Sequence, residues 1–548
     1  MKLYVVLSLC LSFIGTGCAS TNGRAGSSSY ELNQDVANDA GRAQLVVVLL
    51  IDQLGSWVLK RYLPYLPKNG AFHYARRRGR VAYLHAGTFT APGHAATFTG
   101  APPAHSGVIA NLVWNRRTHS LQNVVNQHQH PWLSDPKRFS SPKVLMVPTV
   151  GDALFAASGG RSQIVSLSFK DYAAVLAGGR NANLVLWFDS NKVHPEFTTS
   201  DYYMNELPQW LVTWQEQHPA KDYLDIWQVQ DPTLAQTVNG PDDAPSEDSW
   251  DGFGRTFPHD PKNAQNPYEA LIATPRGVDY LLDLALASIE NLELGVDKAA
   301  DFLAISISSP DVISHHFGAE SWEYFELLRY IDMRLMVFIK ELEKRGPVAF
   351  MLTSDHGIAP TPEKQTEDDR KGRINPRALQ GRLERGLDAA LGERDWIAAF
   401  QPPYIYFNDD VRQGGLRDRA AKTVLRILEK DPSIEQVFDV RKIYGSRDEN
   451  SLIEYAVALS IPEHTDADIY VLPKYGRVFN DAEGAVGSNH GTPWDYDRDV
   501  PVVMWGPGIW SIHTTERMDQ RRVPATMAEM LHIPAPWYVQ KPPLEGAR

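Results

Sequence analysis

Two short motifs contain side chains that can act on a substrate or bind a metal: Thr90-Ala-Pro-Gly-His94 and Ser354-Asp-His-Gly357. The second motif directly follows the apolar, strand-like run 349–353. Other Asp and His residues occupy similar positions, close to the end or the start of an apolar run. They are Asp52, after the run 45–51, Asp311 and His315, after the run 302–309, and His490, before the run 500–505.

In an open α/β sheet, ligands bind beyond the carboxyl ends of the strands, and these side chains would meet there. Three carboxylates, three imidazoles and one hydroxyl are more ligands than a single four-coordinate zinc ion needs. The set therefore predicts a hydrolytic site with two metal ions. Its members are Asp52, Thr90, Asp311, His315, Asp355, His356 and His490.

Thr90 is the predicted nucleophile. Pro92 fits the first turn of a helix, so Thr90 would lie at or just before the helix amino terminus. The helix dipole and the free backbone N–H groups favour negative charge there, and a metal contact would lower the pKa of the hydroxyl. A threonine that only caps a core helix is the alternative, and the surrounding candidate ligands favour the nucleophile.

The other candidates each have a simpler reading when taken alone. The four-residue spacing of Asp311 and His315 places both on one face of a helical turn, where an exposed or capping pair is also common. His490 stands in a glycine-rich loop. Asp355-His356 is the more specific pair, because the end of a buried strand rarely carries two such groups without a partner.

The length of 548 residues would suit several domains, but ligands that span Asp52 to His490 must converge on one pocket. We therefore predict one α/β catalytic domain, residues 44–548, around a mostly parallel sheet. Amphipathic helices are expected at Gly277–Leu292, Glu323–Lys344 and Arg417–Glu429. Insertions are expected near 115–275 and 361–483.

The amino terminus has the pattern of an export signal. Lys2 is followed by an apolar stretch over 3–14, too short to span a bilayer, and residues 1–17 are predicted to be a signal peptide. Small residues before Cys18 resemble a bacterial lipobox, which predicts a lipid anchor on Cys18; cleavage by an ordinary signal peptidase is the alternative. Residues 18–43 are a predicted flexible tether. These features predict a periplasmic protein, anchored to the outer membrane of a bacterium only through its lipid.

The composition adds two constraints. The net charge of −12 and the pI near 5.8 argue against binding to nucleic-acid polymers. Cys10 and Cys18 are the two cysteines of the chain, so the mature protein is predicted to lack disulfides.

Several motifs in order along the chain resemble the alkaline phosphatase superfamily, in its branch with a threonine nucleophile. The sequence is similar to the phosphate-irrepressible, single-chain bacterial alkaline phosphatases, which are related to type I phosphodiesterases/nucleotide pyrophosphatases. The similarity extends over almost the whole chain. The matching segments are Thr90–Gly100, Pro103–Val108, Asn111–Trp114, Phe169–Asp171, Thr199–Tyr203, Thr256–His259, Asp311–Gly318 and Ser354–Gly357.

The resemblance implies an alkaline-phosphatase-like, three-layer αβα sandwich with inserted cap segments and two zinc ions. It implies one zinc ion held by Asp52, Asp355, His356 and the Thr90 oxygen, and another held by Asp311, His315 and His490. It also implies that Asn111 and Lys170 contact the phosphoryl group of a small phosphate ester. The expected enzyme is a monomer that acts through a phosphothreonine intermediate.

One departure from the family pattern concerns specificity. The phosphomonoesterases of the family have Lys-Asp-Arg where this chain has Lys170-Asp171-Tyr172. A tyrosine hydroxyl gives one neutral hydrogen bond in place of a bidentate guanidinium. Phosphomonoester hydrolysis remains the leading prediction, and phosphodiester or nucleotide pyrophosphate hydrolysis is the alternative. A lipoprotein that binds a ligand without turnover is disfavoured, because all seven ligand positions are filled.

Overall fold

The computed structural model describes residues 42–126, 129–192, 195–365, 372–445, 451–480 and 486–547. The predicted signal peptide and most of the predicted tether, including Cys18, lie outside the described residues. None of the helices in the described ranges has the length and apolarity needed to cross a membrane.

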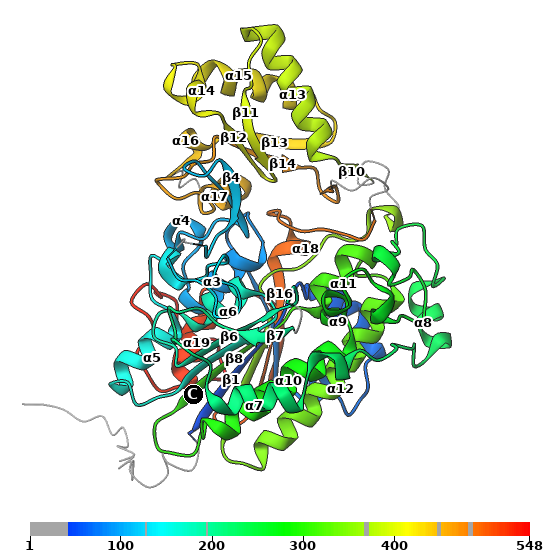
Figure 1. Ribbon diagram of the computed structural model, residues 1–548, viewed down its shortest axis with the longest axis vertical. Coiled ribbons are helices and arrows are strands. Elements are labelled where there is room, and N and C mark those ends of the chain that lie inside the picture. The colour runs from blue at the N-terminus through cyan, green and yellow to red at the C-terminus, as the bar shows by residue number, and fades with distance from the viewer. Residues whose placement is uncertain are drawn as a thin grey trace, which may run out of the picture. The chain divides into compact units, whose positions relative to one another are not determined.

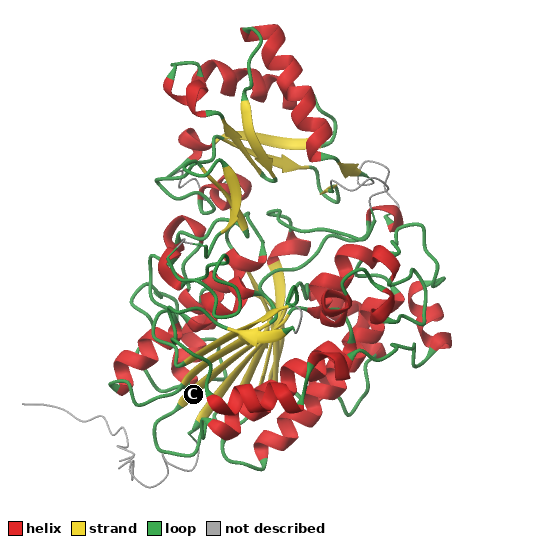
Figure 2. Ribbon diagram, in the orientation of Figure 1, coloured by secondary structure: helices red, strands yellow, loops and turns green. Residues whose placement is uncertain are grey.

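A nine-stranded sheet forms the centre of the described chain (Figures 1 and 2). Its strand order is β17-β2-β16-β9-β1-β8-β5-β6-β7. The inner strands β9, β1, β8, β5 and β6 run parallel, whereas β16 is antiparallel to both of its neighbours and β7 is antiparallel to β6. The strands are β1 (Leu45–Ile51), β2 (Arg77–Ala82), β5 (Ile164–Ser168), β6 (Leu184–Asp189), β7 (Glu196–Thr198), β8 (Asp301–Ile307), β9 (Val348–Thr353), β16 (Asp499–Trp505) and β17 (Ile512–Asp519).

Helices cover both faces of this sheet, as Figure 1 shows. The main helices are α1 (Ser56–Tyr62), α3 (Thr90–Thr99), α5 (Val150–Ser158), α6 (Asp171–Gly178), α7 (Gln209–Gln217), α10 (Pro275–Asn291), α11 (Ser309–Phe317), α12 (Trp322–Glu343) and α19 (Arg522–Met530). Shorter ones are α2 (Ala71–Tyr74), α4 (Pro103–Ser106), α8 (Pro232–Asn239), α9 (Pro267–Ile272) and α18 (Asp495–Arg498). The helices predicted near 277–292 and 323–344 are therefore confirmed.

Alternation along β1 explains the three layers, because successive side chains of a strand point to opposite faces. Val47 and Leu49 belong to a core cluster that includes residues of α10 and α12. Val46 and Val48 belong to a second cluster with residues of α3, α5 and α19. All seven residues of β1 are buried, as expected for a strand that is covered on both faces. The predicted αβα architecture is confirmed.

The region 115–275 is only partly outside the main sheet. Strands β5 and β6 lie within it and form part of the nine-stranded sheet. Their apolar runs are only five and six residues long, and they stand between polar and aromatic segments, which is why the sequence pattern did not separate them. The same region contains the small hairpin β3 (Leu112–Asn115) and β4 (Ser120–Asn123).

Residues 373–480 contain a second, four-stranded sheet of order β11-β12-β14-β13, which we call the cap (Figure 2). The cap has its own hydrophobic core, in which α13 and α15 pack on the sheet. The helix predicted at Arg417–Glu429 is α15. The cap elements are β10 (Arg373–Ile374), α13 (Pro376–Leu391), β11 (Ile397–Gln401), β12 (Tyr404–Phe407), α14 (Asp409–Gln413), α15 (Arg417–Leu428), β13 (Ile434–Asp439), α16 (Val440–Ile443), α17 (Leu452–Ala458), β14 (Ile469–Pro473) and β15 (Val478–Phe479).

Candidate active site

Thr90 is the first residue of α3, and its side chain is buried. Its Oγ1 lies 3.3 Å from Nε2 of His356. The backbone N–H of Ala91 donates to Oδ1 of Asn111 at 2.8 Å. The side-chain nitrogen of Asn111 therefore does not take part in this bond and can donate to another group. The nucleophile candidate therefore stands where a helix dipole favours negative charge, as its position before Pro92 predicted.

Gly93 explains how α3 comes so close to the end of β9. A Cβ atom at this position would lie 2.2 Å from the backbone oxygen of Asp355, a separation that is sterically impossible. Glycine therefore permits the contact between the helix that carries Thr90 and the strand end that carries Asp355 and His356. This accounts for the glycine of the Thr-Ala-Pro-Gly-His motif.

The three aspartates come from three neighbouring strands. Asp52 follows β1, Asp355 follows β9 and Asp311 lies in the first turn of α11, just after β8. Because these strands are adjacent in the order β9-β1-β8, their carboxyl ends bring the side chains together. Asp52 and Asp355 are fully buried, and Asp311 is nearly so.

Three of the predicted ligands gather around Nε2 of a fourth, His356. In addition to the Thr90 oxygen, Oδ1 of Asp52 lies 3.5 Å and Oδ2 of Asp355 lies 3.6 Å from this nitrogen. Oδ1 of Asp52 is buried and has no hydrogen-bond partner among the described residues. Burial lowers the pKa of His356 to about 3, so its ring is neutral at ordinary pH.

The other three predicted ligands form a second group. Nε2 of His315 lies 3.2 Å from Oδ1 of Asp311, and Nε2 of His490 lies 3.5 Å from the same oxygen. Asp311, His315 and His490 could hold one metal ion, and Asp52, Asp311 and His356 could hold another, since within each group the ligand atoms lie within 4.8 Å of one another. The structure therefore brings all seven predicted ligand residues into one site.

The orientation of the three imidazoles fits a metal. Nδ1 of His315, His356 and His490 lies 3.1, 2.9 and 2.8 Å, respectively, from a backbone carbonyl oxygen. A carbonyl only accepts, so Nδ1 carries the proton in each ring and Nε2 is directed at the carboxylates. In a neutral ring such as that of His356, Nε2 has a lone pair, and a lone pair facing carboxylate oxygens is unfavourable unless a cation lies between them. Backbone carbonyls that fix histidine ligands in this way are typical of metal sites.

Lys170, the residue before α6, reaches into the same site. Its Nζ lies 2.6 Å from Oδ2 of Asp52 and 2.5 Å from Oδ2 of Asp311. Burial lowers the pKa of Lys170, but Asp311 and Asp52 more than offset this and hold it well above its usual value. Burial likewise raises the pKa of Asp311, yet the Lys170 ammonium and His315 bring it well below the usual range. Burial, Asp311 and Asp355 raise the pKa of Asp52 despite Lys170.

Two further residues contact this site and were not predicted to act in it. Gln53 donates from its side chain to Asp311 and from its backbone to Asp355. Nδ1 of His94 lies 2.9 Å from the carbonyl oxygen of Thr90, and Nε2 lies 2.9 Å from Ser306 Oγ, so His94 ties α3 to β8. Nothing in the apolar run before Gln53 marked that residue in the sequence.

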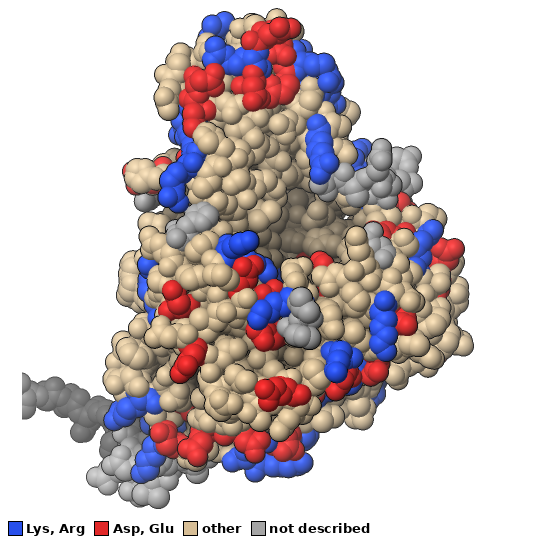
Figure 3. All heavy atoms as spheres, viewed as in Figure 1, with Lys and Arg blue, Asp and Glu red and all other residues tan. Residues whose placement is uncertain are grey.

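A cavity of about 770 Å³ adjoins the site and separates the cap from the main sheet domain. Asn111, His315 and His490 line its floor, and a recess is visible beside the cap in Figure 3. Its other walls are rich in aromatic and polar side chains from both parts of the chain. These include Phe89 and Trp114 from the main domain and Arg377, Gln380, Phe400 and Phe479 from the cap. Trp187 is fully buried in a core cluster and does not line this cavity.

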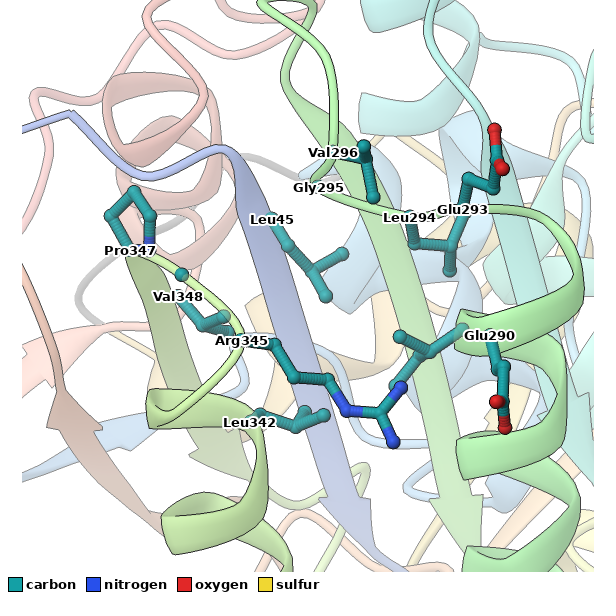
Figure 4. A pocket seen from close by; sticks show the side chains of 12 residues that line it. Leu45, Glu290, Glu293, Leu294, Gly295, Val296, Leu342, Arg345, Pro347 and Val348 are labelled. Atoms are coloured by element: carbon teal, nitrogen blue, oxygen red, sulfur yellow. The ribbon is translucent and has the colours of Figure 1, made fainter.

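A smaller hollow of about 350 Å³ lies at the opposite end of the sheet (Figure 4). It contains Leu45, the first residue of β1, whereas Asp52 follows the last. Its wall combines apolar side chains with Glu290, Glu293 and Arg345. None of the predicted site residues contributes to it.

Comparisons with known proteins identify the family of this chain. A model of the type I phosphodiesterase / nucleotide pyrophosphatase family matches residues 46–446. The alkaline phosphatase PhoV of Synechococcus elongatus is 27% identical over 545 residues, which cover 96% of this chain and 97% of PhoV. A protein of Myroides odoratus that is named a calcium-transporting ATPase is 26% identical over 515 residues, which cover 90% of this chain and 93% of that protein.

The alkaline phosphatase PafA of Elizabethkingia meningoseptica is 26% identical over 531 residues, 92% of this chain and 94% of PafA. A crystal structure of wild-type PafA superimposes with a TM-score of 0.85 at 25% identity, and it covers 93% of this chain and 100% of that chain. The fold and the site together define a phosphoric ester hydrolase. The chain belongs to the type I phosphodiesterase / nucleotide pyrophosphatase family, within the alkaline phosphatase superfamily.

Proposed function

We propose that the protein is a zinc-dependent alkaline phosphatase that hydrolyses phosphomonoesters through a phosphothreonine intermediate on Thr90. The observation that carries this proposal is the position of the Thr90 hydroxyl, 3.3 Å from a neutral imidazole nitrogen that two buried carboxylates also face. The names of PhoV and PafA support the choice of a phosphatase.

Seven side chains of this chain would hold two zinc ions. Asp52, Thr90, Asp355 and His356 would bind one, and Asp311, His315 and His490 would bind the other. When bound, the metal ions would supply Lewis acidity that lowers the pKa of the Thr90 hydroxyl and neutralises charge on the phosphoryl group and the leaving oxygen.

The side chains and the backbone of the protein carry out the other steps of the proposed reaction. Thr90 Oγ1 attacks phosphorus and gives its proton to solvent. The bond from phosphorus to the leaving oxygen breaks, and that oxygen takes a proton from solvent and departs as the alcohol. The amino terminus of α3 stabilises negative charge at the attacked group. Asn111 accepts the Ala91 N–H through Oδ1, which leaves its amide N–H groups for a phosphoryl oxygen. Water then attacks the phosphothreonine and restores the hydroxyl.

Lys170 supplies a fixed positive charge beside the reacting phosphoryl group. Its ammonium is held by Asp52 and Asp311, and its pKa lies well above the usual value, although burial acts in the opposite direction. The charge therefore persists across the neutral and alkaline range. A cation that stays charged at high pH suits a phosphatase that works under alkaline conditions.

Tyr172 favours a second candidate function, the hydrolysis of phosphodiesters or nucleotide pyrophosphates. Burial raises the pKa of Tyr172, so the group that replaces the arginine of family phosphomonoesterases is neutral. A cavity of about 770 Å³ offers room for a large group on the far side of phosphorus. A singly charged diester needs less positive charge than a doubly charged monoester.

The deciding experiment compares p-nitrophenyl phosphate with bis-p-nitrophenyl phosphate, using the purified mature protein loaded with zinc and Thr90→Ala as the control. A higher kcat/KM for the monoester supports the alkaline phosphatase, and a higher value for the diester assigns the second function. Full activity of Thr90→Ala would refute the nucleophile. Zinc content by elemental analysis tests the proposed two ions per chain.

The proposed location follows from the sequence of the amino terminus. The signal peptide and the lipobox-like residues before Cys18 support export to the periplasm and a lipid anchor in the outer membrane. The proposed catalytic unit is a monomer. Metabolic labelling with a fatty acid analogue, with Cys18→Ser as control, and light scattering of the mature protein test these two proposals.

A further inference from the structure

Gln53 is a buried residue with an unusual backbone conformation, directly after Asp52 at the end of β1. Its side chain has no exposed surface, and its φ of 68° lies in the left-handed region that residues with a Cβ seldom adopt. Such conformations are costly, and they persist where the surrounding structure holds them, often at functional sites.

The contacts of Gln53 join the two proposed metal groups. Its backbone N–H donates to Oδ1 of Asp355 at 3.2 Å, and its side-chain Nε2 donates to Oδ1 of Asp311 at 2.8 Å. The first carboxylate belongs to the group around His356, and the second belongs to the group with His315. One residue thus holds a carboxylate from each group.

Asp311 and Ser314 fix the direction of the Gln53 amide. Because the Asp311 carboxylate only accepts, the end of the amide that faces it is Nε2. Oε1 is then the end that accepts from the Ser314 hydroxyl, one residue before His315 on α11. The amide has no freedom to turn without breaking one of these buried bonds.

The backbone turn at Gln53 makes this bridge possible. In a regular strand, the side chains of Asp52 and Gln53 would point to opposite faces of the sheet. Here the Asp52 carboxylate contacts Lys170 and the Gln53 amide contacts Asp311, which itself binds Lys170. The left-handed conformation therefore delivers two consecutive side chains to the same site.

We propose that Gln53 is a positioning residue that couples the two metal sites, so that filling one site prepares the carboxylates of the other. This inference rests on the proposed two-metal function. The carboxylate of Asp311 is held on one oxygen by Gln53 and on the other by Lys170. Partners that orient a metal ligand in this way typically change metal affinity 10–100-fold when they are removed.

The test is a zinc titration of the chelator-treated full-length mature protein, by calorimetry, for wild type and for Gln53→Met and Gln53→Gly. Methionine keeps the volume of the side chain and removes the donor, whereas glycine also relieves the backbone conformation and so protects folding. We expect both variants to bind the second zinc ion about 10–100-fold more weakly than wild type, with the first affinity changed less than about threefold. The melting temperature of the zinc-free protein is measured alongside. It should fall in both variants, because Asp311 and Ser314 lose the buried amide that they contact, so affinities are compared at a temperature at which both variants are folded.

Two further variants sharpen the result. Glu293→Gly is the matched control, because Glu293 also has a positive φ, of 52°, and lies at the opposite end of the sheet. It should leave both zinc affinities unchanged. Ser314→Ala should weaken the second zinc ion in wild type but add nothing in the Gln53→Met background, since it acts through the same amide.

Three results would overturn the proposal. In the first, Gln53→Met and Gln53→Gly bind both zinc ions with wild-type affinity. In the second, wild type binds only one zinc ion, and in the third, the two variants lose affinity for both zinc ions to the same extent. The proposal would also be overturned if Ser314→Ala weakened the second zinc ion as much in the Gln53→Met background as in wild type. The titration requires no turnover. A wild-type protein that binds two zinc ions but cleaves neither ester would therefore refute the proposed function and leave the coupling to be decided on its own.

Discussion

Replacing Tyr172 by arginine should move specificity toward phosphomonoesters. Tyr172 is the second residue of α6, follows Lys170 closely and lies in the electrostatic field of Asp311 and Asp52. Burial raises the pKa of its hydroxyl, and Lys170 opposes this only in part, so the group stays neutral in an alkaline assay. Tyr172→Arg therefore adds a full positive charge beside the phosphoryl group.

The magnitude follows from the difference in substrate charge. A unit charge about 4 Å from a phosphoryl oxygen contributes about 4 kcal/mol per unit of substrate charge at an effective dielectric constant of about 20. Hydrogen bonds to charged groups contribute about 1.5–3 kcal/mol in practice. Because Asp52 and Asp311 also attract the new guanidinium, we expect the lower end, about 1.5 kcal/mol. That corresponds to a rise of about tenfold in the ratio of monoester to diester kcat/KM.

The assay measures kcat/KM for p-nitrophenyl phosphate and bis-p-nitrophenyl phosphate with zinc-loaded wild type, Tyr172→Arg and Tyr172→Phe. Phenylalanine removes the hydroxyl but keeps the ring and the net charge, so it should affect both esters alike. The ratio should stay within about threefold of wild type, since a neutral hydrogen bond at the low end, about 0.5 kcal/mol, corresponds to about a twofold change. An unchanged ratio in Tyr172→Arg, or a shift toward the diester, would refute the reasoning that links this position to substrate charge.

Three other perturbations have defined outcomes. Gly93→Ala should lower kcat at least about 100-fold and weaken zinc binding, because its Cβ would collide with the backbone of Asp355. Activity assays and calorimetry measure the two effects. Wild-type values for both would contradict the close approach of α3 to Asp355. Burial and then Glu323 raise the pKa of Glu247 to about 8, so the folded state keeps a proton that the unfolded state releases near pH 4.5, and stability falls as pH rises between these values. From pH 5 to pH 9, wild type should therefore lose on the order of 4 kcal/mol of stability that Glu247→Gln keeps, because about three pKa units of about 1.4 kcal/mol each lie in this range. The difference between their melting temperatures should change by about 4 °C, and Glu269→Gln, at an exposed position, is the matched control. Chelation should lower the melting temperature and abolish turnover, and added zinc should restore both; no change on chelation would argue against resident metals.

The sequence predicted the fold, and the seven predicted ligands lie together in the structure, because the relevant signals are local. Apolar runs such as 45–51 end in an acidic residue, and the ends of parallel strands meet at one edge of a sheet. The role of Gln53 could not be predicted in this way, because it depends on a left-handed backbone conformation. A glycine in the sequence would have indicated such a conformation, and a glutamine does not. The contribution of cap residues such as Phe400 and Phe479 to the cavity was also hidden, because it depends on how the cap packs against the main domain, which the sequence pattern does not show.

The separate core of the cap has a consequence for how this enzyme can change during evolution. The cap supplies Arg377, Gln380 and Phe400 to the cavity wall, whereas the proposed metal ligands lie in segments outside it. Mutations in the cap can therefore alter which alcohols are accepted while the reaction centre keeps its shape. Substrate preference and reaction chemistry are thus carried by different segments of the chain, and each can change by mutation without the other.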